Sequence, residues 1–186
     1  MRVFISWSGD RSRAIAELLQ AWLPIVIQAV QPYFSPDDIT KGARWAIEIA
    51  SALEEISVGI ICLTRENLTA PWIIFEAGAL SKSLQTSKVC PLLFGVSESE
   101  LEESPLAIFR AAKFSKREMK KVVNMINGEL KDSKIVQDDL EVIFEVLWPQ
   151  LETQVLAELK KGDAETTPRR STRELLEDVY KGVRFS

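Results

Sequence analysis

One carboxylate stands inside an apolar stretch of the sequence, and its position is the first indication of possible chemistry. Between Pro71 and Leu80 every residue is apolar or glycine except Glu76. On a helix, residues four apart share a face, so Glu76 would lie beside Trp72. A helix that is apolar nearly all round is largely buried, and burial raises the pKa of a carboxyl group unless a cation or hydrogen bonds compensate. Glu76 is therefore a candidate for a functional carboxylate in a cleft. Pairing with an arginine, or a place at the solvent-exposed margin of its helix, fits the same spacing.

Other polar or aromatic residues in predicted turns have structural explanations beside the functional ones. Ser6 and Ser8, in the stretch SWSGD, could donate hydrogen bonds to a phosphate or cap the turn. Asp37 and Asp38 are adjacent, so their side chains diverge, which favours turn capping over a metal site. Trp45, at the start of a predicted helix, fits either the core or stacking on a ligand. We expect no metal site in this chain.

The composition excludes several classes of function. The chain has no histidine, which removes Ser-His-Asp and Cys-His catalysis and most zinc sites. The net charge of −4 gives no basic excess for nucleic acid or an anionic membrane surface. Cys62 and Cys90 each lie in an apolar run and are interpreted as small buried hydrophobic residues. The sequence contains neither a signal peptide nor an apolar run of membrane-spanning length, so we expect a cytoplasmic protein.

The apolar pattern alternates between strands and helices along the chain. Continuous or β-prone runs predict strands at 2–6, 31–35, 57–64 and 88–96, with a weak edge strand near 112–114. Stripes of helical period predict helices at 11–30, 43–56, 71–84, 116–130 and 138–160. Such alternation predicts an α/β domain with a parallel sheet, in which ligands bind at the carboxyl ends of strands. Three segments should therefore meet there: 6–10, 35–42 and 64–72.

Three stretches together resemble a known family. VFISWSGD (3–10), FSPDDITKGARW (34–45) and SVGIICLTRENLTAPWIIFEAGAL (57–80) are similar, in order and spacing, to a prokaryotic Toll/interleukin-1 receptor (TIR) domain. The resemblance covers roughly residues 1–130. It implies a flavodoxin-like sheet of five parallel strands with helices on both faces. We expect residues 1–134 to form the TIR domain, with an added amphipathic helix at 135–160 packed on it. Residues 161–186 would be a linker and a short C-terminal helix or tail.

The resemblance also implies an activity, because W-x-x-x-E is the catalytic signature of NAD-cleaving TIR domains. Trp72 and Glu76 match it, so Glu76 would be the catalytic residue. Substrate contacts would come from Ser6, Trp7, Ser8, Ile39, Trp45 and Trp72. NAD+ would be a consumed substrate and not a cofactor, and the products would be nicotinamide and ADP-ribose or a cyclic variant. One departure concerns phosphate contacts, since family members often carry basic residues just after the first strand, and here Asp10 precedes Arg11.

The same resemblance predicts partners. Many family members are active only when assembled, so we expect self-association through the TIR domain, and a separate effector or sensor protein is a possible further partner. In bacteria such proteins commonly serve anti-phage immune signalling. Two alternatives stay open: a non-enzymatic TIR scaffold acting by homotypic assembly, and a flavodoxin-like nucleoside-processing enzyme such as a deoxyribosyltransferase.

Overall fold

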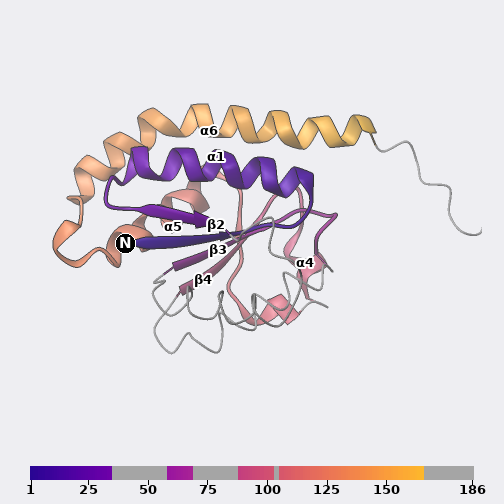
Figure 1. Ribbon diagram of the computed structural model, residues 1–186, viewed down its shortest axis with the longest axis horizontal. Helices are drawn as coiled ribbons and strands as arrows, with labels where there is room; N and C mark the ends of the chain where they lie inside the picture. Colours follow the sequence, from indigo (N-terminus) through magenta and orange to yellow (C-terminus); the bar gives the residue numbers. More distant parts are fainter. Residues whose placement is uncertain (35–57, 69–87, 103–104, 166–186) are drawn as a thin grey trace, which may run out of the picture.

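The fold is an open, all-parallel sheet of five strands. The computed structural model describes residues 1–34, 58–68, 88–102 and 105–165. The strands are β1 (Arg2–Ser6), β2 (Gln31–Phe34), β3 (Val58–Leu63), β4 (Lys88–Leu93) and β5 (Ala112–Lys113). Their order across the sheet is β2-β1-β3-β4-β5, and every neighbouring pair is parallel (Figure 1). This is the flavodoxin-like order, so the fold class predicted from the sequence is confirmed.

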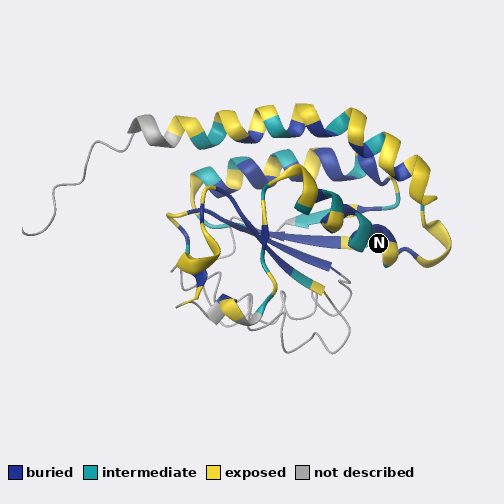
Figure 2. Cartoon of the chain, turned by 180° about the vertical axis from the view of Figure 1, so that it is seen from behind, coloured by how far each residue is buried: buried dark blue, intermediate teal, exposed yellow. Residues whose placement is uncertain are grey.

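The central strands are apolar because both of their faces are covered. All six residues of β3 are buried, as expected for a central parallel strand. In β1, successive side chains point to opposite faces, yet Val3, Phe4 and Ile5 are all fully buried. Figure 2 shows β1, β3 and β4 in the colour of buried residues along most of their length.

The longer helices are α1 (Asp10–Val26), α5 (Lys116–Gly128) and α6 (Gln137–Glu165). Short pieces follow the later strands: α4 (Glu98–Leu101) and the 3-10 turns η1 (Pro105–Ile108) and η2 (Lys131–Ser133). Pro24 lies inside α1, and the helix ends two residues later at Val26, short of the predicted end at residue 30. None of the helices in the described ranges is both long and apolar enough to cross a membrane.

Helix α6 lies along α1 and forms a third layer outside the sheet (Figure 1). One face of α6 is buried against the rest of the chain through Leu140, Phe144, Trp148, Leu151 and Val155. The indole Nε1 of Trp22 in α1 donates to the carbonyl oxygen of Leu147 at 3.1 Å. The Trp22 ring also meets Phe144 edge to face, with centroids 5.9 Å apart.

A series of aromatic side chains connects α6 to the ends of β4 and β5. Phe94, after β4, packs against Phe114, after β5, at 5.1 Å between ring centroids, and Phe114 lies 5.1 Å from Trp148 of α6. Trp148 stacks on Phe144 at 5.7 Å. Such ring pairs add to the apolar area that they bury, so α6 belongs to the core of this chain. The observed helix continues to Glu165 and does not end near residue 160, and the predicted domain boundaries at 134/135 and 160/161 stay predictions.

Candidate functional site

The carboxyl ends of β1 and β3 bring two turns together at one edge of the sheet. The strands pair directly, with Ser6 opposite Ile61. The β1–α1 turn (residues 7–9) and the turn after β3 (residues 64–68) therefore emerge side by side. In open parallel sheets this edge, next to the point where strand order reverses, is where ligands bind.

The β1–α1 turn is held by a serine that sequence reasoning did not single out. Ser12 is fully buried, and its hydroxyl accepts from the amide of Ser8 at 2.9 Å and donates to the Ser8 carbonyl at 2.8 Å. Gly9 between them has φ 87°, a conformation that strains any residue with a Cβ. The four-residue spacing of the two serines, with Gly9, Asp10 and Arg11 between them, is the sequence signal that would have identified this clamp. The clamp fixes Ser8 at the mouth of the site.

The turn after β3 is held by Asn67, which is also almost fully buried. Its side-chain oxygen accepts from the amide of Thr64 at 2.8 Å, and its amide nitrogen donates to the carbonyl of Cys62 at 2.9 Å. An asparagine that bonds its own backbone a few residues away is a typical turn device. The pattern Thr64-x-x-Asn67 was visible in the sequence but was not used.

An ion pair joins the two turns. The Arg11 guanidinium Nη1 lies 2.6 Å from the Glu66 carboxylate Oε1. A second ion pair, with 3.5 Å between Arg65 Nε and Glu100 Oε1, links the turn after β3 to α4. The segment that leaves β3 is therefore held on two sides, by α1 and by α4.

Between these turns the structure has a cavity of about 510 Å³. It is lined by Ser8, Gly9, Asp10, Arg11 and Ser12 from the first turn and α1, by Thr64 and Glu66 after β3, and by Glu158 and Lys161 near the end of α6. The two α6 residues pair with each other at 2.5 Å. The backbone amides at the start of α1 carry partial positive charge at this cavity.

Two buried polar atoms beside this edge have no hydrogen-bond partner within the described part of the chain. They are Trp7 Nε1 and Thr64 Oγ1, and Thr64 is one of the residues that line the cavity. Buried polar groups in native proteins are nearly always paired, so an unpaired one needs an explanation. The Trp7 ring is also covered by the Arg13 guanidinium, whose carbon lies 5.3 Å from the ring centroid.

The structure describes three of the predicted site residues. Ser6 ends β1 and is fully buried, Trp7 is half-buried in the turn, and Ser8 lines the cavity. The other four, Ile39, Trp45, Trp72 and Glu76, lie outside the described residues, and their roles stay predictions.

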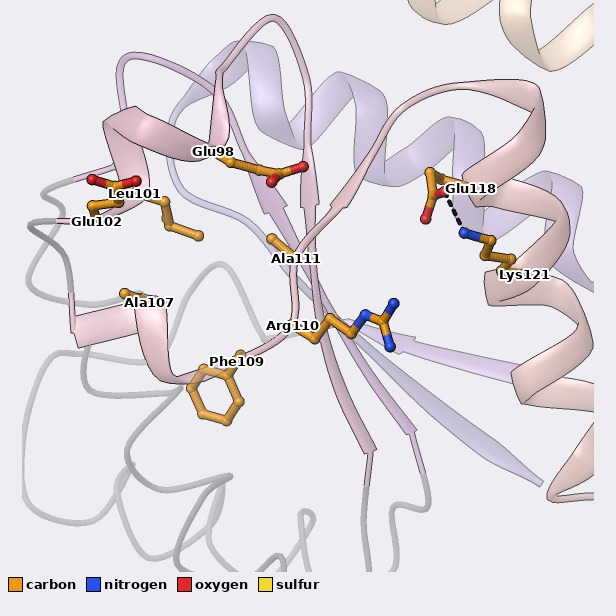
Figure 3. Close-up of a pocket in the computed structure, with 9 residues that line it drawn as sticks. All are labelled: Glu98, Leu101, Glu102, Ala107, Phe109, Arg110, Ala111, Glu118 and Lys121. Carbon is orange, nitrogen blue, oxygen red and sulfur yellow. Dashed lines mark hydrogen bonds and ion pairs between the residues drawn. The ribbon is translucent and has the colours of Figure 1, made fainter.

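A second cavity, of about 460 Å³, lies beside β5 (Figure 3). Its wall carries Glu98 and Glu102 from the α4 region, Arg110 before β5, and Glu118 and Lys121 of α5. Lys121 Nζ donates to Glu118 Oε1 at 2.6 Å, and this hydrogen bond is the main reason that the pKa of Glu118 lies below its usual value. The described wall contains none of the residues predicted to bind substrate.

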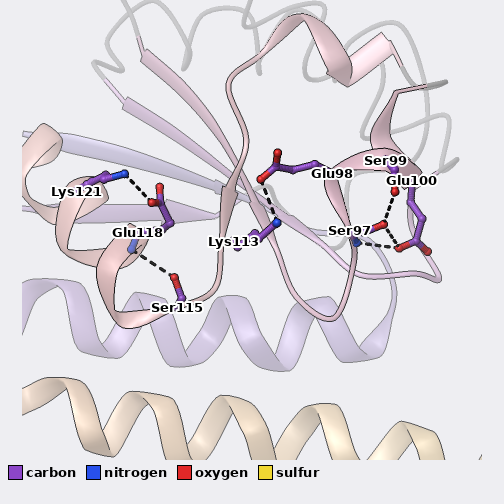
Figure 4. Close-up of polar contacts among 8 residues, drawn as sticks. All are labelled: Ser97, Glu98, Ser99, Glu100, Lys113, Ser115, Glu118 and Lys121. Carbon is purple, nitrogen blue, oxygen red and sulfur yellow. Dashed lines mark hydrogen bonds and ion pairs between the residues drawn. The ribbon is translucent and has the colours of Figure 1, made fainter.

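Polar contacts fasten the elements around this second cavity (Figure 4). Ser97 and Glu100 form a capping box at the start of α4, and hydrogen bonds from the Ser97 amide and hydroxyl lower the pKa of Glu100. Glu98 pairs with Lys113 of β5 at 3.4 Å, and Ser115 caps α5. These contacts indicate that the charged side chains here stabilise the first turns of α4 and α5.

Comparison with known protein families identifies the family to which this fold belongs. The strand order and the cleft at the carboxyl ends of β1 and β3 define a flavodoxin-like α/β domain. A family model described as TIR domain matches residues 3–126. The chain belongs to the TIR domain family. The match ends at residue 126, within α5, so α6 lies beyond the matched region.

Two solved structures of azoreductases share a distant likeness. An azoreductase from Bacillus anthracis str. Sterne is 11% identical, with 86% of this chain and 98% of that chain covered and a TM-score of 0.40. The azoreductase AzrA is 9% identical, with 86% and 99% covered and a TM-score of 0.40. No curated protein matches the chain.

Proposed function

We propose that this chain is an NAD+ nucleosidase that cleaves the bond between nicotinamide and ribose. The observation that carries the proposal is the pair Trp72 and Glu76, a W-x-x-x-E signature in a TIR domain sequence. This signature follows four residues after the turn at 64–68 that borders the cavity. The products would be nicotinamide and either ADP-ribose or a cyclic form of it.

The chemistry needs little beyond a well-placed carboxylate. When the nicotinamide–ribose bond breaks, positive charge develops on the ribose, as it does in glycoside hydrolysis. A carboxylate in a site of low dielectric stabilises this oxocarbenium-like state, and it also accepts hydrogen bonds from ribose hydroxyls. Nicotinamide leaves as a neutral molecule, so no general acid is required and the absence of histidine is no obstacle. Attack by water gives ADP-ribose, whereas attack by a nucleophile within ADP-ribose gives a cyclic product.

The described part of the cleft supports this proposal. The cavity lies at the strand edge where flavodoxin-like domains bind ligands. Thr64 lies in the cavity wall, and its buried hydroxyl has no hydrogen-bond partner among the described residues. Ser8 and the first amides of α1 offer further donors at the same wall. Ile39, Trp45 and Trp72 would complete the pocket around the substrate.

Self-association is part of the proposal. TIR domains commonly self-associate. In this chain the loop at 36–44 would complete the site of a neighbouring copy, so cleavage would depend on assembly. We infer a role in bacterial anti-phage immune signalling in the cytoplasm, together with a sensor or effector protein.

Chromatography of the products from NAD+ tests the proposal. Wild-type protein and Glu76→Ala would be incubated with NAD+ at low and high protein concentration and with a crowding agent. Nicotinamide release by wild type alone, rising with assembly, is the expected result, and the second product distinguishes hydrolysis from cyclisation. Because many TIR domains are non-enzymatic, absence of nicotinamide under all conditions would favour the scaffold alternative. Release of free base from nucleosides but not from NAD+ would favour a deoxyribosyltransferase.

A further inference from the structure

The outer face of α6 carries an exposed apolar stripe. The described residues expose five large apolar side chains, and three of them lie on α6: Val142 (64% exposed), Val146 (71%) and Leu156 (45%). Pro149 and Thr153 between them are also exposed. The five positions follow one another at intervals of 4, 3, 4 and 3 residues, the spacing by which one helix meets another along a seam.

This stripe lies opposite the face that α6 already buries. Leu140, Phe144, Trp148, Leu151 and Val155 pack inward, and at 100° per residue the outer positions fall on the far side of the helix. Valine is a poor helix former compared with the residues usually found on exposed helix faces. A helix with apolar residues on two opposite faces has a second surface on which a partner can pack. The inner partner is the body of the chain, whereas nothing in the described ranges covers the outer face.

The order of residues along α6 fits a second copy running in the opposite direction. A two-fold axis at Pro149 pairs residues whose numbers add to 298, so Val142 faces Leu156 of the other copy. The same axis brings Asp138, in the first turn, opposite Lys160 near the far end. Opposite charges then meet at both ends, and the helix dipoles run antiparallel. The apolar pair Val142 and Leu156 and the charges at both ends therefore match across a two-fold axis, as a symmetric interface requires, whereas Val146 comes level with Glu152 of the other copy.

We propose that the outer face of α6 is a self-association surface, through which two copies of this chain pair as antiparallel helices. This surface lies outside the matched TIR region, and the proposal does not depend on NAD+ cleavage.

The estimated area of this surface is that of a weak contact. Residues 138–160 of a helix span about 35 Å, and a contact about 10 Å wide buries about 350 Å² on each copy. The total of about 700 Å² is below the roughly 1,200 Å² of a standard stable interface. The pair is therefore weak in dilute solution and forms at high concentration, or when TIR assembly brings the helices together.

The neighbouring charges favour a protein partner over a membrane. Glu141 and Glu145 flank the stripe and form ion pairs with Lys120 and Lys116 of α5. Helices that lie on anionic membranes carry basic residues beside their apolar face instead. Binding to anionic vesicles is therefore an outcome that would contradict the proposal.

Sedimentation equilibrium on the full chain tests the pairing with two matched substitutions. Val146→Glu lies on the stripe, whereas Val136→Glu changes an equally exposed valine (66%) just before the helix begins. We expect wild type and Val136→Glu to show the same concentration-dependent dimer, and Val146→Glu to raise its dissociation constant at least about tenfold. Equal association of all three proteins, or a wild type that stays monomeric up to about 0.5 mM, overturns the proposal.

Cysteine cross-linking tests the antiparallel arrangement, since both native cysteines are buried. Pro149→Cys should cross-link to itself with a short bismaleimide. Val142→Cys and Leu156→Cys should cross-link when mixed, and Val142→Cys alone should not. Cross-linking of Val142→Cys to itself, with no cross-linked product that contains both variants in the mixture, would indicate parallel helices and contradict the geometry proposed.

Discussion

Arg11, in the first turn of α1, lies 2.6 Å from Glu66, in the turn that follows β3. The contact joins two elements 55 residues apart in sequence at the edge of the sheet where the cavity lies (66 − 11 = 55). Both side chains are partly solvent-exposed, with 20% and 48% of their surfaces accessible. Exposed ion pairs add little stability, so the main consequence of this one is the position of the turn that leads toward Glu76.

Glu66→Gln should therefore show whether the ion pair positions the turn after β3 without stabilising the fold. We expect the free energy of unfolding to change by less than about 1 kcal/mol, because the pair is partly exposed. NAD+ cleavage should fall about tenfold in kcat/KM, since a small displacement of a site segment is costly to rate. Denaturant unfolding and nicotinamide release measure the two effects. The control is Glu17→Gln, which removes the exposed Arg13–Glu17 pair on α1. Equal cleavage by both variants would show that the Arg11–Glu66 contact does not position the site.

Asn67→Ala should destabilise the whole domain. The substitution leaves the Thr64 amide and the Cys62 carbonyl without their side-chain partner in a buried turn. Each unsatisfied buried group costs about 1–3 kcal/mol, so we expect a loss of about 2–4 kcal/mol in urea unfolding. Asn124→Ala is the matched control, because Asn124 makes an exposed hydrogen bond with Gln137. Its effect should stay within about 0.5 kcal/mol. Similar losses in the two variants would contradict the role given to Asn67.

Truncation of two neighbouring residues of α6 should have very different effects on the free energy of unfolding. Phe144 is fully buried between Trp22 and Trp148, and Phe144→Ala should lower the free energy of unfolding by about 3–5 kcal/mol. Val142, two residues earlier, is 64% exposed, and Val142→Ala should cause no measurable loss in dilute protein. Thermal or urea unfolding compares them. A small effect of Phe144→Ala would mean that α6 is not part of the cooperative core.

The two cysteines should be inert at neutral pH and should weaken the fold at high pH. Burial raises the pKa of the Cys90 thiol to about 11 and that of Cys62 further still. The unfolded chain releases these protons near pH 8.5, whereas the folded chain keeps them, so alkaline conditions favour the unfolded state. Stability should be unaffected by these groups below about pH 8 and should fall above about pH 9. Urea unfolding at pH 7 to 10 measures the free energy of unfolding as a function of pH. The double variant Cys62→Ser/Cys90→Ala lacks both thiols, so its free energy of unfolding should fall less steeply above about pH 9 than that of the wild type. Rapid thiol labelling of the native protein at pH 8 would contradict the buried placement.

The sequence predicted the sheet because its signals are local. Continuous apolar runs identified β1 and β3, and even the two-residue β5 lies within the expected 112–114. The clamps at Ser12 and Asn67 were missed because serine and asparagine are common in loops, and their partners are backbone atoms that only the folded turn brings within reach. The outer stripe of α6 was missed for a different reason. Val142, Val146 and Leu156 look like ordinary members of an apolar helix until the structure shows which face is already covered.

Nicotinamide release by an isosteric variant tests the catalytic role proposed for Glu76. Glu76→Gln keeps the size of the side chain and removes its charge. Wild-type protein, assembled at high concentration, should release nicotinamide from NAD+. Glu76→Gln, equally folded and equally associated, should lose at least about a hundredfold in rate, because the charge that stabilises the oxocarbenium-like state is gone. Equal rates of nicotinamide release by the two proteins would show that Glu76 is not the catalytic residue.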